Sequence, residues 1–379
     1  MIYLDNAATT FPKPQKVISG VERCLKKYSA NPGRSGHKLS QKASEEIYLC
    51  RKKLCDFFTA DAPENVVFTA NCTTAINMVL KGELTPGDHV ICSGYEHNSV
   101  IRPLNKLSTY GVEYDVARVF TENPSSTVSA FEALIKDNTK MIICTHASNV
   151  NGIILPIKEI GEMAHKHGVK FAVDAAQSAG ILPINMKKMN IDYLFVAPHK
   201  GLYAPMGVGV LIAETNVRDT LIEGGTGSMS IRPLQPDFLP DRLESGTVNL
   251  SGIVGISAGL DFINEIGIRT IYTREYGLMS KAYNQLKNTT GVSLYNDNFE
   301  FGKTAPVLSF NIKGRKCEEV GEALDRMGIA VRAGLHCAPL AHKTIGTGDI
   351  GTVRACPSVY TTKNDIDSLI NGIKLLIKS

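Results

Sequence analysis

The 379-residue chain contains no tryptophan, and aromatic residues make up only 7% of it. No apolar run approaches the roughly 20 residues that a membrane-spanning helix needs. The N-terminus, MIYLDNAATT, has an acidic residue where a signal peptide has a cationic start and an apolar run. The net charge of +4 is spread along the chain without a basic cluster. We therefore expect a cytoplasmic protein that binds neither nucleic acid nor a membrane.

The nine cysteines are odd in number and include no CxxC pair. Cys50 and Cys55 have no later pair that would complete a zinc site, so we expect no metal centre. Most of the cysteines lie within apolar segments and are expected to be buried and reduced. Cys337 is the one cysteine that we separate from this group.

Short apolar runs alternate with amphipathic segments from about residue 66 onward, which predicts an α/β fold. Near-continuous apolar strands separated by helices are typical of a mostly parallel sheet that is covered on both faces. Ligands of such sheets bind at the carboxyl ends of the strands. The predicted strands are 66–70, 89–93, 141–148, 170–176, 192–197 and 208–213, and the predicted helices between them include 73–82 and 157–168.

The pattern changes after about residue 250 and predicts a second, smaller α+β domain. We expect a large domain at 15–255, and a small domain at 256–379 that also includes the N-terminal segment 1–14. A Gly/Ser/Pro-rich stretch at 224–240 is interpreted as a long functional loop rather than a linker. The small domain is predicted to contain a long helical stretch at 253–289, a strand at 305–312, a helix at 317–328 and a C-terminal helix at 364–379.

Asp174 and Lys200 both follow predicted buried strands, so they are expected at the same edge of the sheet. A lysine amine there can hold an aldehyde as a Schiff base, and a carboxylate can face a protonated ring nitrogen. Pyridoxal 5'-phosphate (PLP) requires this pair of groups, because its protonated pyridine accepts electrons. The alternative interpretation is an aspartate that solvates a turn and a surface lysine.

Further polar residues at predicted strand ends suit the same cofactor. The segment Asn71-Cys72-Thr73-Thr74 begins a helix, whose N–H groups and dipole favour a phosphate. His97 follows a strand and is a candidate for stacking on the ring. Asn149 and Gln177 can hydrogen-bond the phenolic oxygen of the cofactor. The alternatives are an ordinary N-cap, a loop histidine and strand-end turns.

Eight motifs, in order, resemble those of the cysteine desulfurases, which are class V, fold-type I PLP enzymes. The motifs are YLDNAATT, ANPGRSGHKLS, EHNSV, SNVNG, VDAAQSAG, HKGLYAPMGVGVL, LESGTVN and RAGLHCAPLAH. The RxGxHC context is more similar to the SufS-like, selenocysteine lyase-like group II than to the group with a long mobile loop. The resemblance implies a large domain with a mostly parallel seven-stranded sheet and a smaller α+β domain.

The resemblance also implies roles for individual residues. Lys200 matches the Schiff-base lysine, Asp174 the partner of the pyridinium, and His97 the ring-stacking residue that relays protons. Thr247 matches a residue that reaches the phosphate from the neighbouring subunit, which implies a homodimer. Arg354 matches the arginine that binds the substrate carboxylate. The remaining matches to the cofactor set are Cys72, Thr73, Asn149, Gln177 and His199, and the residues expected to line the substrate pocket are His37, Asn149 and Arg332.

Cys337 matches the nucleophilic cysteine of the family. The resemblance implies conversion of L-cysteine to L-alanine, with a persulfide on Cys337 that passes to a sulfur-acceptor protein. A nucleophilic cysteine needs exposure and nearby positive charge, for which Arg332 and a charged His336 are candidates. The alternative is a buried structural cysteine in an irregular loop.

Two segments depart from the family pattern. Ala197-Pro198 replace a hydroxyl residue and a glycine, which predicts that one phosphate hydrogen bond is missing or is supplied by another residue. Cys356, Ser358 and Thr361 stand where relatives often have Ser, Gly and Asn, and Cys356 is a candidate to accept sulfur or to form a disulfide. Alternative functions are a selenocysteine lyase acting on L-selenocysteine, and another class V enzyme such as an aminotransferase.

Overall fold

The computed structural model describes residues 1–33, 36–296 and 298–378. Positions 34 and 35 of the quoted motif at 30–40, and the last residue of the predicted C-terminal helix, lie outside the described residues. In the described part, no helix is both long and apolar enough to cross a membrane.

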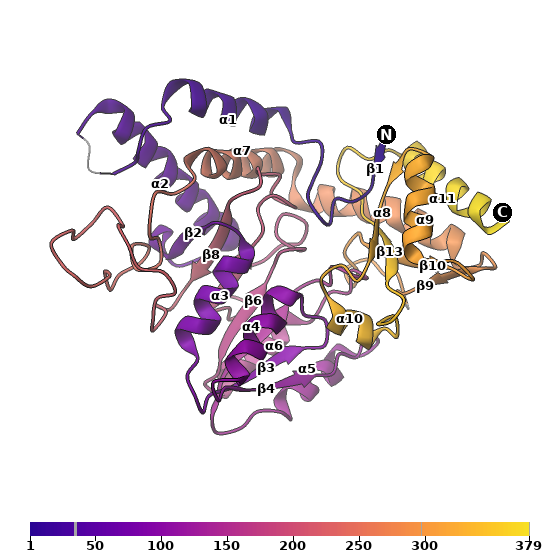
Figure 1. Cartoon of the computed structure of the whole chain (residues 1–379), viewed down its shortest axis with the longest axis horizontal. Helices are drawn as coiled ribbons and strands as arrows, with labels where there is room; N and C mark the ends of the chain where they lie inside the picture. Colours follow the sequence, from indigo (N-terminus) through magenta and orange to yellow (C-terminus); the bar gives the residue numbers. More distant parts are fainter. Residues whose placement is uncertain (34–35, 297, 379) are drawn as a thin grey trace.

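A seven-stranded sheet forms the centre of the large domain (Figure 1). Its strand order is β2-β8-β7-β6-β5-β3-β4, and only β8 runs antiparallel to its neighbours. The predicted mostly parallel sheet is therefore confirmed. The strands are β2 (Val66–Thr69), β3 (His89–Ser93), β4 (Glu113–Ala117), β5 (Thr139–Thr145), β6 (Lys170–Asp174), β7 (Tyr193–Val196) and β8 (Gly209–Ala213).

Helices cover both faces of this sheet, as the apolar strands predicted. On one face, Ile142, Val173 and Leu194 share a core with α1, α2, α6 and α7. Alternate residues of the same strands, such as Ile143 and Phe195, pack on the other face against α3 and α4. The helices of this domain are α1 (Gln15–Lys27), α2 (Lys38–Phe58), α3 (Cys72–Glu83), α4 (Asn98–Ser108), α5 (Pro124–Glu132), α6 (Ile157–Lys166) and α7 (Leu250–Ile266), with a short 3-10 helix at Pro63–Asn65.

The small domain contains an antiparallel sheet of order β12-β13-β10-β9 with its own apolar core. The N-terminus belongs to this layer, because β1 (Ile2–Tyr3) pairs in parallel with β11 (Ile329–Ala330). Figure 1 shows the N-terminus beside the C-terminal helices. The other elements are α8 (Ile268–Leu286), β9 (Val292–Leu294), β10 (Leu308–Ile312), α9 (Cys317–Arg326), β12 (Arg332–Gly334), α10 (Pro339–Thr344), β13 (Thr352–Ala355) and α11 (Lys363–Lys378).

The predicted helical stretch at 253–289 is two helices rather than one. Gly267 ends α7 with φ of +87°, a left-handed conformation that favours glycine and stops the helix. Most of α7 belongs to the core of the large domain, whereas α8 from Leu278 onward belongs to the core of the small domain. The predicted domain boundary at residue 255 stays a prediction.

Candidate active site

A cavity of about 170 Å³ lies at the carboxyl ends of the parallel strands, and we call it the lysine cavity. It brings together residues that follow five different strands, because parallel strands all end at this edge of the sheet. Its lining includes eight of the nine predicted cofactor-site residues, namely Cys72, Thr73, His97, Asn149, Asp174, Gln177, His199 and Lys200.

The N-terminus of α3 forms one wall of the lysine cavity. Asn71 caps the helix, since its side-chain oxygen accepts a hydrogen bond of 2.9 Å from the backbone N–H of Thr74. Cys72 and Thr73 occupy the first turn, where backbone N–H groups have no partner within the helix. Together with the helix dipole, these donors can bind an anion at the cavity wall.

Asp174 and Lys200 form an electrostatic pair in the lysine cavity. Asp174 is only 4% exposed, and its Oδ1 accepts a hydrogen bond of 2.9 Å from the N–H of Ala176. Burial raises the pKa of Asp174, while the Ala176 N–H and the charge of Lys200 act in the opposite direction. Burial lowers the pKa of Lys200, and Asp174 partly counteracts this effect. A cationic ligand group beside Asp174 would therefore be stabilised, and Lys200 loses its proton more readily than an exposed lysine.

Two glycines bring the backbone that bears Lys200 against the turn after Asp174. A Cβ built on Gly201 would lie 2.2 Å from the carbonyl oxygen of Ala179, and one on Gly180 would lie 2.2 Å from the carbonyl oxygen of Gly201. Gly180 also has φ of +84°. The two turns can touch only because neither glycine has a side chain, and this contact fixes where the Lys200 side chain begins.

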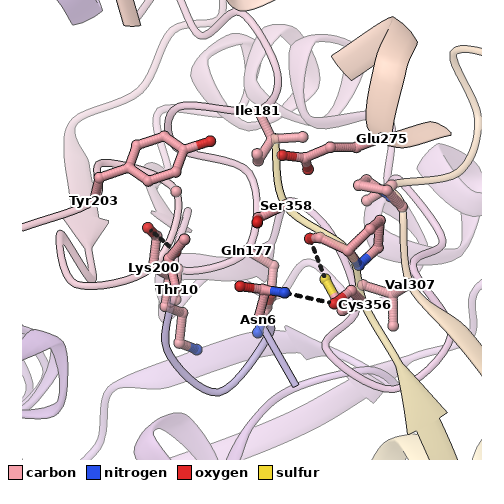
Figure 2. Close-up of a pocket in the computed structure, with 15 residues that line it drawn as sticks. Asn6, Thr10, Gln177, Ile181, Lys200, Tyr203, Glu275, Val307, Cys356 and Ser358 are labelled. Carbon is pink, nitrogen blue, oxygen red and sulfur yellow. Dashed lines mark hydrogen bonds between the residues drawn. The ribbon is translucent and has the colours of Figure 1, made fainter. Parts of the chain in front are cut away.

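A second, smaller cavity of about 30 Å³ lies on another side of Lys200 (Figure 2). Glu275, Tyr203 and Cys356 line it together with Lys200 and Gln177. Glu275 is 2% exposed, and burial raises its pKa to about 8. The carboxyl group is therefore mostly protonated at neutral pH, and it was not predicted from the sequence, where it is one of many acidic residues in a helix.

His97 caps α4 and lines the lysine cavity. Its Nδ1 accepts a hydrogen bond of 3.1 Å from the N–H of Ser99, so the neutral ring carries its proton on Nε2. Burial, followed by the charges of Lys200 and Arg102, lowers the pKa of His97 to about 4. Burial also lowers the pKa of His199 to about 4. Both rings are therefore neutral at pH 7.

Cys337 is exposed and lines an adjoining cavity of about 350 Å³, which we call the cysteine cavity. Thr73, His97 and Ser99 line both cavities. His336 and Cys337 have φ of +50° and +56°, an uncommon conformation for residues other than glycine. Hydrogen bonds of 2.8 Å hold both carbonyl groups: the side chain of Asn149 donates to His336, and the backbone N–H of Asn98 donates to Cys337.

The prediction that His336 could supply positive charge near Cys337 is wrong. The ring is 6% exposed, and burial together with Arg354 lowers its pKa to about 2, so it stays neutral. The nearby cations that line the cysteine cavity are instead Lys81, Arg102 and Lys106.

Cys356 does not match the expected second sulfur acceptor. It is 7% exposed, and burial raises the pKa of its thiol. Sulfur transfer needs an exposed cysteine that ionises readily, and Cys356 has neither property. Seven of the nine cysteines are buried, as the sequence predicted, and all nine are free thiols.

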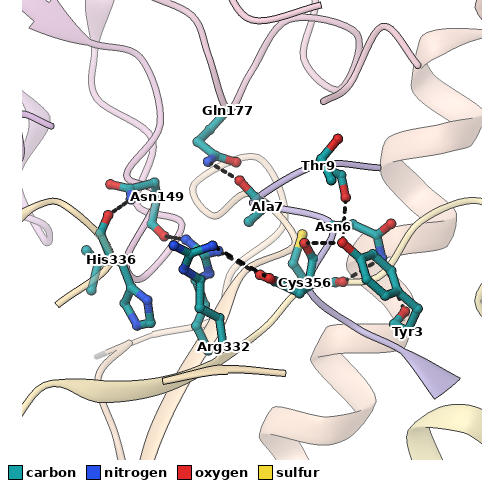
Figure 3. A network of polar contacts seen from close by, with 12 residues as sticks. Tyr3, Asn6, Ala7, Thr9, Asn149, Gln177, Arg332, His336 and Cys356 are labelled. Carbon is teal, nitrogen blue, oxygen red and sulfur yellow. Dashed lines mark hydrogen bonds and ion pairs between the residues drawn. The ribbon is translucent and has the colours of Figure 1, made fainter. Parts of the chain in front are cut away.

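Arg354 on β13 is buried and lies opposite Arg332 of β12 in the antiparallel pair; Arg332 is labelled in Figure 3. One of its terminal nitrogens, Nη1, donates to the carbonyl oxygen of Asn149 at 2.8 Å, and the other, Nη2, lies 2.9 Å from Oδ1 of Asp5. Arg332 is more exposed, and its nearest approach to Oδ2 of Asp5 is 3.8 Å. Asp5 was not predicted as a site residue, although it lies within the quoted YLDNAATT motif.

Four predicted residues are not among those that line the lysine or cysteine cavity: Arg332, Arg354, His37 and Thr247. His37 is an exposed N-cap of α2, and its Nδ1 accepts a hydrogen bond of 3.2 Å from the N–H of Ser40. Thr247 is also exposed and lines a separate cavity of about 800 Å³ between α2 and the loop before α7. An ion pair between Arg51 and Glu244, with an N–O distance of 2.8 Å, fixes the end of that loop against α2.

The fold and the lysine cavity together define an enzyme-like site of the class V type. A family model described as Aminotransferase class-V matches residues 2–369. A probable cysteine desulfurase of Methanothermobacter thermautotrophicus is 33% identical over 97% of this chain and 92% of its own length. A cysteine desulfurase of Shigella sonnei is 32% identical over 99% of this chain and 93% of its own length.

Solved structures agree with these sequence comparisons. The apo structure of a cysteine desulfurase from Thermococcus onnurineus NA1 superposes with a TM-score of 0.91, at 32% identity over 100% of this chain and 94% of the other. The cysteine desulfurase CsdA of Escherichia coli superposes with a TM-score of 0.88, at 27% identity over 99% of this chain and 94% of the other. The chain belongs to the aminotransferase class-V family, in its cysteine desulfurase branch.

Proposed function

We propose that the chain is a PLP-dependent cysteine desulfurase, which converts L-cysteine to L-alanine and leaves the sulfur as a persulfide on Cys337. The observation that supports this most directly is the pair of adjoining cavities. One contains Lys200 and Asp174, the other contains the exposed Cys337, and His97 lines both.

The residues of the lysine cavity fit PLP. The first-turn N–H groups of α3, with Thr73, suit its phosphate, and Lys200 suits its aldehyde. The buried carboxylate of Asp174 suits a protonated pyridine nitrogen, because burial strengthens the attraction between opposite charges. When bound, PLP supplies the electron sink that labilises the bonds at the α-carbon of an amino acid.

Lys200 is the proposed proton carrier at the substrate α-carbon. Its lowered pKa increases the fraction of neutral amine that can accept a proton. His97 is neutral, and its Nε2–H is a hydrogen-bond donor because Nδ1 is held by Ser99. Arg354 is the proposed partner of the substrate carboxylate, for which its planar guanidinium is suited.

Cys337 is the proposed nucleophile. Its thiolate attacks the substrate sulfur, a new S–S bond forms, and the carbon–sulfur bond breaks with its electron pair staying on carbon. Protonation of that carbon gives the methyl group of alanine. Lys81, Arg102 and Lys106 line the same cavity as this thiol.

The same three cations support transfer of the sulfur to an acidic acceptor protein. All are exposed, and none forms an ion pair with another residue in the described part of the chain. An acceptor with a carboxylate-rich surface would approach the cysteine cavity under electrostatic steering. L-selenocysteine is the alternative substrate, and the relative turnover of the two amino acids by the wild-type protein discriminates between them.

We also propose that the enzyme is a cytoplasmic homodimer. Its nine free thiols suit a reducing compartment. Thr247 and His37, which the family resemblance assigns to the active site, are exposed and do not line the lysine cavity of their own chain. They would complete the site of a second copy. Mixing Lys200→Ala with Thr247→Ala protein should then restore activity in hybrid dimers, whereas sites formed within one chain would give no restoration.

The decisive test compares the wild type with Cys337→Ala for alanine and sulfide release from L-cysteine, in the presence of PLP and a thiol reductant. We expect the wild type to form both products. The variant should lose turnover of cysteine but keep the absorbance of bound PLP. A variant as active as the wild type would show that Cys337 is structural and would favour another class V reaction.

A further inference from the structure

Asp5 places one carboxylate between Arg354 and Arg332, and Figure 3 shows the network of polar contacts around Arg332. Its Oδ1 lies 2.9 Å from Nη2 of Arg354, and its Oδ2 lies 3.8 Å from Nη1 of Arg332. The arginines are direct partners in the β12–β13 register, so both guanidinium groups project from the same face of the sheet. The cluster has two positive charges and one negative charge.

Arg354 is only partly satisfied by these contacts. It is 3% exposed, and the part of the chain that the structure describes offers no partner to its buried Nε. Its contact with Asp5 uses a single nitrogen, although a guanidinium can bind a carboxylate through two. The uncompensated positive charge and the unpartnered donor together suit one additional carboxylate.

The backbone holds Asp5 in this position. The N–H of Cys356 donates to the carbonyl oxygen of Leu4 at 2.7 Å, and the side chain of Asn6 donates to the carbonyl oxygen of Cys356 at 2.9 Å. The N–H of Leu4 donates to Ala330 at 2.9 Å. Because its neighbours on both sides are fixed, the backbone of Asp5 keeps the carboxylate within reach of both arginines.

We propose that Asp5 is a specificity-determining residue that limits the arginine pair to ligands with one carboxylate. This inference rests on the proposed function, in which Arg354 binds the α-carboxylate of an amino acid. With Asp5 present, the cluster neutralises one ligand carboxylate. A second carboxylate on the same ligand would meet the negative charge of Asp5 and no free positive charge.

The test measures binding of L-alanine and L-aspartate to the PLP-loaded protein by titration calorimetry. The two amino acids have the same α-carboxylate and differ by one side-chain carboxylate. Asp5→Asn keeps the shape of the side chain and removes its charge, so we expect about tenfold tighter binding of L-alanine and a larger gain for L-aspartate. The ratio of the affinity for L-alanine to the affinity for L-aspartate should therefore decrease. The control variant is Asp137→Asn, which makes the same change of charge at an exposed position far from the cluster. It should alter neither the affinity for L-alanine nor that for L-aspartate.

A second variant tests the inference in the opposite direction, and it remains informative if Asp5→Asn does not fold. Arg332→Gln removes one positive charge, so L-alanine should bind about tenfold more weakly and the preference against L-aspartate should widen. A merely structural Asp5 predicts instead that Asp5→Asn weakens binding of both ligands equally, and that result would overturn the inference. An unchanged ratio of affinities in both variants would also overturn it.

Turnover of L-cysteine on the same preparations tests the proposed function separately. For Asp5→Asn we expect KM to fall together with kcat, because tighter binding of the carboxylate slows release of L-alanine. A wild-type protein that binds L-alanine but releases no sulfide would contradict the proposed function. The comparison of the two binding affinities would still decide the role of Asp5.

Discussion

Replacing Gly201 by alanine should damage the site without touching a single predicted catalytic side chain. The new Cβ would lie 2.2 Å from the carbonyl oxygen of Ala179, and carbon atoms of this kind essentially never approach a heavy atom closer than 3.0 Å. The Cβ is attached directly to the backbone of residue 201 and the oxygen belongs to the backbone of Ala179, so no side-chain rotation can relieve the clash. The Lys200 turn and the Ala179 turn must therefore separate by most of an ångström.

The expected effects follow from this displacement. Crowding of a packed contact costs about 1–3 kcal/mol in the free energy of unfolding. A misplacement of about 1 Å at a reacting group can lower the rate roughly 100-fold. We expect Gly201→Ala to unfold at a lower temperature, to bind PLP with an altered absorbance spectrum, and to lose about two orders of magnitude in kcat.

Gly277→Ala is the matched control. Gly277 lies within α8 on an exposed position, and a Cβ there would have no neighbour within 4 Å. Alanine in a helix should stabilise the protein by about 0.5–1 kcal/mol. A Gly201→Ala protein with wild-type kcat and spectrum would refute the argument that the glycine contact positions Lys200.

Three further predictions concern other parts of the site. Burial raises the pKa of Glu275 to about 8, so the folded state binds more protons than the unfolded chain between pH 4.5 and 8. Protonation of Glu275 therefore stabilises the folded state, and this contribution falls as the pH rises from 4.5 and is lost above about 8. The melting temperature of Glu275→Gln should therefore decline less between pH 6 and 9 than that of the wild type, and parallel declines would contradict the assigned burial effect. Lys106→Glu should raise the KM for an acidic acceptor protein about two- to fivefold at low salt, with the difference disappearing at high salt; a salt-independent effect would exclude steering. Asn149→Ala removes the donor to His336, a hydrogen bond worth about 1 kcal/mol, so persulfide formation in a single turnover should slow about fivefold, and an unchanged rate would show that the loop is held by other contacts.

The sequence predicted the elements whose patterns are strong. Buried strands such as β5 and β6 are continuous apolar runs, and their ends bring Asp174 to the sheet edge. The edge strand β4 was not predicted, because its exposed and half-buried residues include Glu113 and Asp115. The helix break at Gly267 was also missed, since a single glycine within a periodic pattern does not distinguish a stop from a tolerated position.

The two N-terminal helices lack the usual boundary signals. Pro14 precedes α1 without a side-chain cap, and α2 ends at Thr59 in a left-handed conformation that glycine usually adopts. The charge state of His336 was predicted incorrectly because burial depends on long-range packing that sequence spacing does not reveal. For the same reason the position of Asp5 between two arginines could not be inferred, as its partners are more than 300 residues away.

The N-terminal segment 3–13 connects parts of the chain that are synthesised at very different times. Asp5 contacts Arg354 across 349 positions, and the side chain of Lys13 donates to the carbonyl oxygen of His199 at 2.7 Å across 186 positions. At about 5–20 residues per second, Arg354 leaves the ribosome roughly 20–70 s after Asp5. During that interval the first residues have no small domain to pair with, and Lys200 can fold into the sheet before the arginine cluster exists. The nascent chain can thus acquire its lysine cavity early, but the site becomes selective for its ligand only when translation is nearly complete.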